Sequence, residues 1–323
     1  MKLVKKIILT GMCLLGLAGV AACGKEESSE MPINTEIPAE TPLITTVPKD
    51  EPGETPMVVP SETPMPISTK SPTPTITPTP TPNLLASTIK EEAEKFGFTF
   101  GGPVNGSNVL NSTYQNLIKQ EFNSITATNE MKAYSMLDRS ASQKNPEGMP
   151  VINFTTADRI VEFAQSIVIG VRGHVLVWDA YMSDWFFRED YSWDGAYVDA
   201  ETMKVRLKYY IEEVITHFET KYPGVVYCWD VVNEAVGDNA SEYETGDLRH
   251  VRTMRSGGDN MFYKIIGPEY VELSFLWAKD TVERLREENP AVSIDLFYND
   301  YSTFQEGKRD AIIELLKSVN YYA

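Results

Sequence analysis

The sequence predicts an α/β fold in which parallel strands are arranged as a barrel. From Leu84 onward in the 323-residue chain, helical and strand-like patterns alternate, and strands joined by helices run parallel within one sheet. No glycine-rich phosphate loop follows any strand, which disfavours an open nucleotide-binding sheet. Polar and aromatic residues follow four of the strands, at the edge where parallel barrels perform chemistry.

The first half of the predicted domain alternates regularly. Residues 85–97 contain helix formers and end at Gly97, and residues 114–122 and 156–167 have apolar positions at helical spacing. The strand-like segments between these helices are 96–104, 123–131 and 168–178. Each strand precedes a helix or a long connection, as a parallel sheet requires.

The second half continues the same order. Residues 200–224 form a long amphipathic helix that ends at Pro223 and Gly224. The remaining helices are 268–290 and 308–322, and the remaining strands are 225–235 and 293–301. The sequence thus predicts five strands, whereas closing such a barrel takes eight.

The first 83 residues are predicted to lie outside the folded domain. Residues 1–22 combine basic residues, a short apolar core and small residues, which is typical of an export signal. The letters VAAC end at Cys23 and resemble the lipobox of bacterial lipoproteins, in which the cysteine is acylated. A plain secretory signal is the alternative. Residues 23–83 are rich in proline and threonine, so we expect a disordered tether on the extracellular face of the cell membrane.

Composition and charge limit the classes of partner. The net charge of -17 argues against nucleic acid and suits a neutral substrate. Cys228 is the only cysteine beyond the N-terminal region, so no internal disulfide is expected. Its apolar neighbours favour a buried core residue over a nucleophile. The histidines His174, His217 and His250 show no metal-binding spacing, so no metal is expected.

The letters YCWDVVNEAVGD place Asn233 and Glu234 at the end of an apolar strand. Cleavage of a glycosidic bond needs one carboxylic acid to protonate the leaving oxygen and a second carboxylate as nucleophile or base. Glu234 suits the first role, because partial burial beside Trp229 would raise its pKa. Asn233 could hydrogen-bond the 2-hydroxyl of a sugar. An ion pair of Glu234 with Arg172 or Lys132 is the structural alternative.

Longer segments resemble a known family. The letters RGHVLVW and SDWFF, then WDVVNEAVGD and MFYKIIGPEYVELSFLWA, and finally LFYNDY occur in the order and spacing of glycoside hydrolase family 10 endo-1,4-beta-xylanases. The resemblance covers residues 84–323. It implies a TIM (β/α)8 barrel, of which about the first five βα units are present, retaining hydrolysis of xylan or xylo-oligosaccharide, and no cofactor.

The resemblance also implies a role for each matching residue. Glu234 would be the catalytic acid/base, with Asn233 beside it. The other implied sugar-binding residues are Asn129, Lys132, His174, Trp178, Asn299 and Tyr301. The structural alternatives are a core histidine at His174, core rings at Trp178 and Trp185, and a solvated charge at Lys132.

The chain departs from the family pattern in two binding segments. Thr128 stands where the family usually has a glutamate, and Asp179, Ala180 and Tyr181 replace His-Ser-Gln. We expect these departures to change subsite affinity more than the chemical step.

A further departure concerns the nucleophile. The family places this glutamate in a Thr-Glu-Leu-Asp-like strand end downstream of NDY, and no such segment occurs in the 323 residues. Five strands would leave open sheet edges, so we expect an incomplete copy that does not hydrolyse xylan alone. A surface-tethered xylan-binding protein is the second hypothesis. A cellulase sharing the Asn-Glu pair is disfavoured by RGHVLVW and NDY.

Overall fold

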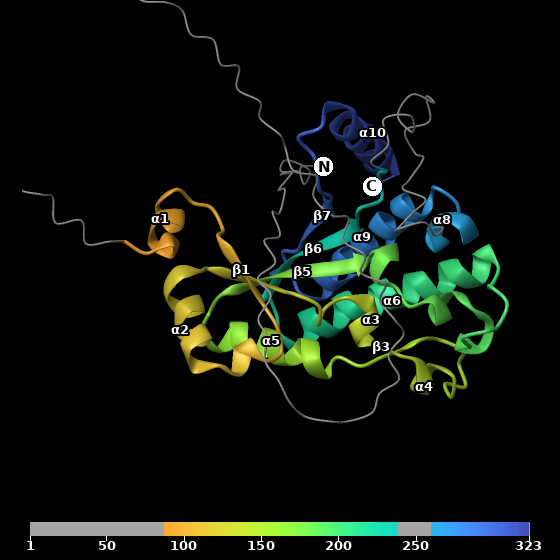
Figure 1. Ribbon diagram of the computed structural model, residues 1–323, viewed down its shortest axis with the longest axis horizontal. Coiled ribbons are helices and arrows are strands. Elements are labelled where there is room, and N and C mark those ends of the chain that lie inside the picture. Colours follow the sequence, from red (N-terminus) through yellow and green to blue (C-terminus); the bar gives the residue numbers. More distant parts are fainter. Residues whose placement is uncertain (1–86, 238–259, 323) are drawn as a thin grey trace, which may run out of the picture. The chain divides into compact units, whose positions relative to one another are not determined.

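The computed structural model describes residues 87–237 and 260–322 (Figure 1). The predicted signal peptide, the tether and the predicted lipidation site Cys23 lie outside the described residues. Within those two ranges, no helix is both long and apolar enough to cross a membrane.

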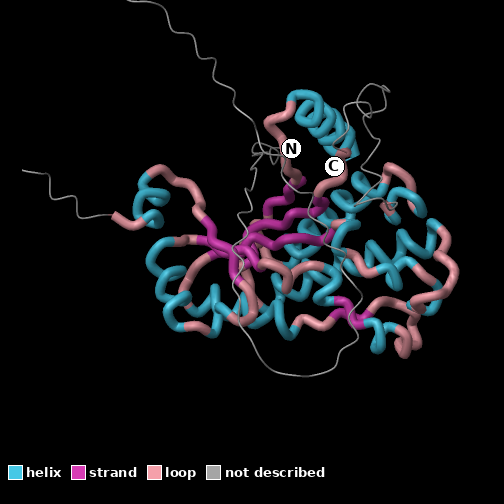
Figure 2. The backbone as a smooth tube through the Cα atoms, viewed as in Figure 1, coloured by secondary structure: helices cyan, strands magenta, loops and turns pink. Residues whose placement is uncertain are grey.

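The predicted five strands are confirmed, and they form one parallel sheet (Figure 2). In chain order the strands are β1 (Gly101–Val104), β2 (Ser124–Ala127), β5 (Gly170–Val177), β6 (Val226–Asn233) and β7 (Asp295–Asn299). Their order across the sheet is β1-β2-β5-β6-β7, so neighbours in sequence are neighbours in space. Parallel strands that follow their chain order across the sheet, with helical connections, are those of a barrel wall rather than of a doubly wound sheet, whose strand order reverses.

The six predicted helices are also confirmed, as α1 (Ile89–Lys95), α2 (Ser112–Glu121), α5 (Thr155–Ser166), α6 (Ala200–Lys221), α9 (Tyr270–Glu288) and α10 (Glu306–Tyr322). The short helices α3 (Ala133–Met136), α4 (Arg139–Ser142) and α8 (Met261–Ile265) were not predicted. Side-chain caps explain several starts: Thr88 and Glu91 form a capping box on α1, and Asp199 accepts a hydrogen bond from the backbone of Thr202 in α6.

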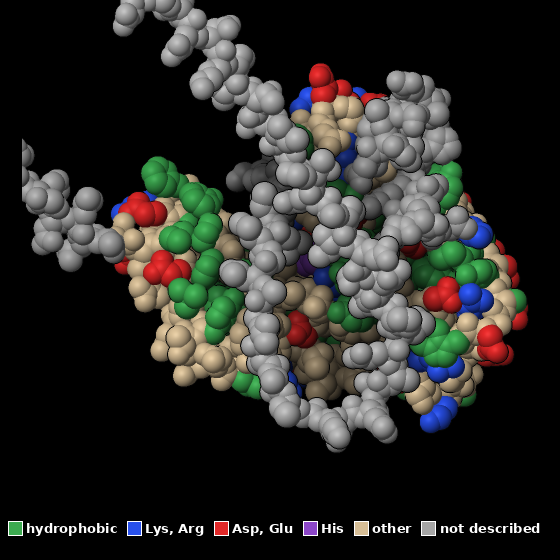
Figure 3. All heavy atoms as spheres, viewed as in Figure 1, with side chains coloured by type: hydrophobic (Ala, Val, Ile, Leu, Met, Phe, Trp, Pro, Cys, Tyr) green, Lys and Arg blue, Asp and Glu red, His purple; other side chains and the backbone are tan. Residues whose placement is uncertain are grey.

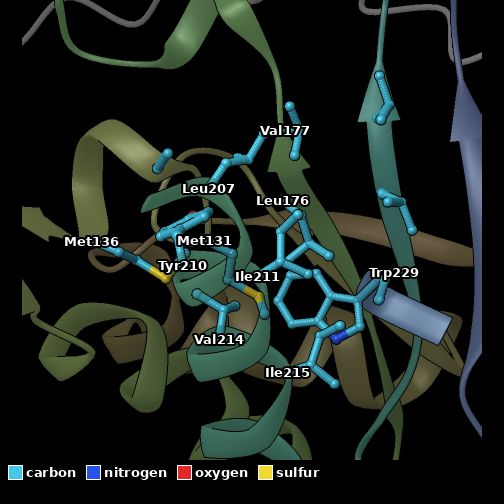
Figure 4. Packing of buried hydrophobic residues seen from close by; sticks show 14 of the residues in the cluster. Met131, Met136, Leu176, Val177, Leu207, Tyr210, Ile211, Val214, Ile215 and Trp229 are labelled. Atoms are coloured by element: carbon cyan, nitrogen blue, oxygen red, sulfur yellow. The ribbon is translucent and has the colours of Figure 1, made fainter. Parts of the chain in front are cut away.

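The helices α5, α6 and α9 bury the apolar side of the sheet. Helix α5 contacts β2 and β5, α9 contacts β6 and β7, and α6 lies beside α9. Figure 4 shows the core between α6 and the strands, where Trp229 of β6 packs beside Leu176 of β5 and Ile215 of α6. Because this side of β6 is filled by apolar groups, polar chemistry is confined to the other side and to the strand ends.

A small antiparallel hairpin was not predicted. It pairs β3 (Leu137–Asp138) with β4 (Val151–Ile152), between β2 and α5. Strands of two residues are too short to show a side-chain alternation, so the sequence carries no strand signal there.

The outer strands of the described sheet are β1 and β7. Figure 3 shows hydrophobic side chains gathered over the region of α1 and α2, next to β1. The exposed apolar side chains of this region are Ile89, Phe96, Phe98, Leu110 and Leu117. An apolar surface beside an outer strand is a place where further protein can pack.

Candidate active site

Most of the predicted site residues lie at or just after the carboxyl ends of four parallel strands, whereas His174 lies within β5. Asn129 follows β2, Trp178 follows β5, Glu234 follows β6 and Tyr301 follows β7. Because all four strands are parallel neighbours, their carboxyl ends lie along one edge of the sheet. The predicted convergence of polar and aromatic residues at this edge is confirmed.

The ends of β6 and β7 bring three predicted residues together. The Nδ2 of Asn299 donates to the Oδ1 of Asn233 at 2.7 Å, and the backbone N–H of Glu234 donates to the carbonyl of Asn299 at 2.9 Å. Asn233 is buried, whereas Glu234 is partly exposed. A carboxyl group at this position can contact a ligand that arrives from solvent and, at the same time, groups of the protein.

Glu234 has a left-handed backbone conformation, with φ of 53°. This conformation costs a non-glycine residue about 1 kcal/mol or more, and it persists only where neighbouring contacts enforce it. It ends the extended strand at Asn233, so the Glu234 side chain no longer follows the strand's alternation. Backbone strain at a residue of this chemistry is a feature of functional sites.

Asp230 joins two residues of β5 inside the sheet. It accepts hydrogen bonds from the Nε of Arg172 at 3.1 Å and from its Nη2 at 2.5 Å. Its other oxygen lies 2.8 Å from the Nδ1 of His174. Burial acts to lower the pKa of Arg172, but the hydrogen bonds and charge of Asp230 outweigh it and raise the pKa. Arg172, which we had considered as an ion-pair partner of Glu234, thus pairs with Asp230.

The His174 side chain is therefore neither without contacts nor surrounded only by apolar groups. Asp230 orients its Nδ1 side, and its ring meets the Trp178 ring edge-on, with centroids 5.7 Å apart. The side chain remains partly accessible. Fixing one ring nitrogen on a carboxylate leaves the other nitrogen available for a ligand.

A lysine and two aromatic rings lie at the other end of the site, after strands β2 and β5. The Nζ of Lys132 donates to Asn129 Oδ1 at 3.1 Å and lies 5.0 Å from the Trp178 ring centre and 4.1 Å from that of Tyr181. Lys132 is only 7% exposed. The interpretation of Lys132 as a solvated charge is therefore wrong; its cation is held against aromatic faces. Tyr181, one of the family departures, is part of this cluster.

Tyr301 lies on a second buried lysine. The Nζ of Lys308 is 3.9 Å from the centre of the Tyr301 ring and 2.9 Å from Asp300 Oδ1. Tyr298 donates its hydroxyl hydrogen to the other oxygen of Asp300 at 2.5 Å. The predicted residue Tyr301 is thus at the edge, supported by a polar cluster that sequence reasoning missed.

Three aromatic or sulfur-containing residues belong to the core. Trp185 is 4% exposed, which leaves Trp178 as the available ring. Trp229 is fully buried, with its ring 5.8 Å from that of Phe218 in α6, so the prediction that Trp229 lies beside Glu234 and raises its pKa is wrong. Burial raises the pKa of Cys228 to about 12, which agrees with a core thiol and disfavours a nucleophile.

Sequence reasoning missed Asp230 and Tyr298. Asp230 had a detectable signal, because an acid within the apolar run CWDVV must be paired if the strand is buried. Tyr298 had none, since its contacts depend on how separate segments meet. Among the described residues, no three histidine, cysteine, aspartate or glutamate side chains form a group that could hold a metal ion.

Comparison with known proteins supports the resemblance. The chain is 39% identical over 229 residues to endo-1,4-beta-xylanase A of Thermotoga maritima, covering 71% of this chain and 18% of that protein. It is 34% identical over 220 residues to endo-1,4-beta-xylanase B of Butyrivibrio fibrisolvens, covering 67% and 31%. The chain thus spans less than half the length of either relative.

Solved structures agree with the fold. A module pair of the Clostridium thermocellum endo-1,4-beta-D-xylanase 10B, complexed with xylohexaose, matches with a TM-score of 0.60 and 31% identity, covering 69% of this chain and 42% of that one. A psychrophilic glycoside hydrolase family 10 endo-beta-1,4-xylanase matches with a TM-score of 0.55 and 30% identity, covering 72% and 62%. The predicted TIM-barrel class is confirmed, and the five parallel strands match part of such a barrel.

The family assignment rests on most of the chain. The sequence profile of glycosyl hydrolase family 10 matches residues 88–321, which include every strand of the sheet and all four strand ends of the site. The chain belongs to glycosyl hydrolase family 10.

Proposed function

We propose that this chain carries the acid/base half of a retaining endo-1,4-beta-xylanase site, with Glu234 as the proton donor. The observation that carries the proposal is the end of β6, where a strained, partly exposed Glu234 follows an Asn233 that is hydrogen-bonded to Asn299. In retaining hydrolysis the acid protonates the leaving oxygen and later takes a proton from water. The names of the relatives support xylan as the substrate class.

The β2–β5 end of the edge suits the binding of a neutral sugar. Trp178 offers a partly exposed ring, and xylose has apolar faces that pack on aromatic rings. Asn129 and Lys132 offer hydrogen-bonding groups next to it, and His174 closes the space towards β6. We propose that these residues hold the sugars on the non-reducing side of the cleaved bond, while Asn299 and Tyr301 hold the chain near Glu234.

The proposal assigns no nucleophile among the described residues. A retaining enzyme needs a second carboxylate about 5 Å from the acid, and the sequence offers no segment that matches the family's nucleophile strand. The second candidate function is therefore xylan binding without hydrolysis.

The experiment combines binding and hydrolysis on the full chain. Xylohexaose is titrated calorimetrically, and xylan digests are analysed for released oligosaccharides. We expect xylohexaose binding without product. Product that disappears in Glu234→Gln, but not in the exposed-residue control Glu201→Gln, would instead show hydrolysis by this chain. A chain that neither binds nor cleaves would contradict both candidates.

We also propose that the mature protein is anchored to the outer face of a bacterial membrane through lipid on Cys23. The basic start, the apolar core and the letters VAAC support this proposal, and two or more acyl chains are enough for stable anchoring. Mass spectrometry of the N-terminal peptide should find diacylglycerol on Cys23. Cys23→Ala should move the protein from the membrane fraction into the medium or leave it unprocessed.

A further inference from the structure

The turn that follows β6 is held by hydrogen bonds from three consecutive backbone N–H groups to residues of β7. The N–H of Glu234 donates to the carbonyl of Asn299 at 2.9 Å. The N–H groups of Ala235 and Val236 both donate to the hydroxyl oxygen of Tyr298, at 3.0 and 3.1 Å. The side-chain oxygen of one residue therefore fixes the two peptide units that come directly after the strained Glu234.

The Tyr298 hydroxyl uses its whole hydrogen-bonding capacity. A phenol has one hydrogen to donate and two lone pairs that accept. Its hydrogen goes to Asp300 Oδ2 at 2.5 Å, and its lone pairs receive the N–H groups of Ala235 and Val236. A carboxylate can only accept, so Asp300 sets the direction of the hydroxyl and turns its lone pairs towards the backbone of the turn.

Asp300 is in turn fixed by charge and by burial. Its Oδ1 accepts from the Nζ of Lys308 at 2.9 Å and from the backbone N–H of Tyr301 at 2.8 Å. The side chains of Asp300 and Lys308 are 1% and 0% exposed. Burial raises the pKa of Asp300, and it raises the pKa of Tyr298 well above its ordinary value, so Tyr298 stays a neutral hydroxyl.

We infer that Tyr298, oriented by Asp300, is a positioning residue that holds the Glu234 turn in its left-handed conformation and thereby aims the Glu234 carboxyl group. The inference rests on the proposed function, because aiming matters only if Glu234 transfers a proton. It differs from a packing role, since the ring of phenylalanine would fill the same space. Only the hydroxyl oxygen reaches the two N–H groups.

The first test is hydrogen exchange in the full chain. Tyr298→Phe removes only the hydroxyl, and Tyr210→Phe is the matched control, since the Tyr210 hydroxyl in α6 is also buried but has no hydrogen-bond partner among the described residues. We expect the amides of Ala235 and Val236 to exchange about tenfold faster or more in Tyr298→Phe, and at the wild-type rate in Tyr210→Phe. Unchanged exchange, or an equal acceleration throughout the chain, would overturn the inference.

The second test follows the Glu234 carboxyl itself by carbon-13 NMR, with Glu234→Gln to assign its resonance. We expect its carbon-13 chemical shift to change in Tyr298→Phe, because the carboxyl group is no longer held in one position, and to stay in place in Tyr210→Phe. A chemical shift that is unchanged in Tyr298→Phe would reduce Tyr298 to a structural residue.

Measuring xylohexaose binding distinguishes a failure of this inference from a failure of the proposed function. The sugar-binding residues at the β2–β5 end do not touch Tyr298 in any described contact, whereas Tyr301 shares Asp300 with it, so xylohexaose affinity is measured for the wild-type chain and for both variants. A wild-type chain that binds no xylohexaose would contradict the proposed function, whereas the exchange and chemical-shift results would still decide whether Tyr298 holds the turn.

Discussion

The two ends of the candidate site are held together by different forces. At the β6–β7 end, Glu234 and Asn233 are fixed by backbone and amide hydrogen bonds to β7. At the β2–β5 end, the Lys132 cation lies against the Trp178 and Tyr181 rings and donates a hydrogen bond to Asn129. The first arrangement depends on strand register, and the second depends on side-chain packing.

This difference matches the tasks that we propose for each end. Proton transfer depends steeply on distance and direction, so an acid gains from being fixed by backbone groups. A sugar platform needs a flat apolar face and a few donors, and it tolerates small side-chain adjustments. Asp230 lies between the two ends, since it reaches from β6 to His174 on β5.

The largest expected effect comes from breaking the link at Asp230. Asp230→Ala leaves Arg172 without its bidentate partner and His174 without its orienting oxygen. Removing one partner of a buried ion pair typically costs about 3–5 kcal/mol, and we expect a loss of that size in the free energy of unfolding, measured with urea. Asp184→Ala is the control, because its pair with Arg188 is more exposed and should cost about 1 kcal/mol or less. Equal losses in the two variants would contradict a structural link.

A smaller effect, dependent on pH, is expected from Lys308→Met at the β6–β7 end. Burial raises the pKa of Asp300 and Lys308 lowers it, so the substitution should raise the pKa further. A carboxyl with a raised folded-state pKa favours the folded state at low pH, and this stabilisation is lost as the pH rises through the folded pKa. The deficit relative to wild type should therefore be small near pH 4 and reach about 2–3 kcal/mol at pH 7.

Urea unfolding at several pH values between these limits measures the deficit. Lys204→Met is the control, because Lys204 pairs with a glutamate whose side chain is 85% exposed. Its effect should stay below about 1 kcal/mol throughout. A Lys308→Met deficit that does not change with pH would show that the charge of Asp300 does not depend on Lys308.

The β2–β5 end should respond through ligand affinity. Trp178→Ala removes the ring on which we propose a sugar packs, so xylohexaose affinity should fall about tenfold, or about 1.4 kcal/mol. Trp193→Ala is the control, because Trp193 is exposed but is not part of the site. Calorimetric titration of both variants tests this prediction, and similar affinities in the two would remove Trp178 from the site.

Local patterns predicted the strands and their polar ends because these features repeat within short segments. The apolar run before Asn233 and the alternation of helices with strands were enough to place Glu234 at the edge of a parallel sheet. Trp229 was misjudged for a reason that the spacing of residues along a strand could have revealed. It lies five positions before Glu234, and residues five apart along an extended strand are about 16 Å apart, too far for contact.

The contacts that hold the site residues in place could not be predicted from local patterns. Tyr298 meets the turn after β6 from more than 60 residues away, as the sequence separations of 63 and 62 for its two backbone partners show. Lys308 likewise reads as a surface charge at the start of a helix, whereas tertiary packing buries it completely against Asp300. Such contacts depend on strand register and helix placement rather than on any local pattern.

The smallest expected effect concerns Cys228. It lies in the interior of β6, whereas Glu234 follows the end of the same strand. Burial raises the pKa of the Cys228 thiol to about 12, so almost no thiolate is present at pH 8 and alkylation should be slow in the folded chain. Peptide mapping after iodoacetamide treatment should show Cys228 unlabelled in buffer and labelled in urea. Cys228→Ala should lower the free energy of unfolding by only about 1 kcal/mol and leave xylohexaose binding unchanged. Rapid labelling in buffer would instead place this strand at an accessible surface, and a buried strand is what lets β6 hold Glu234 in position.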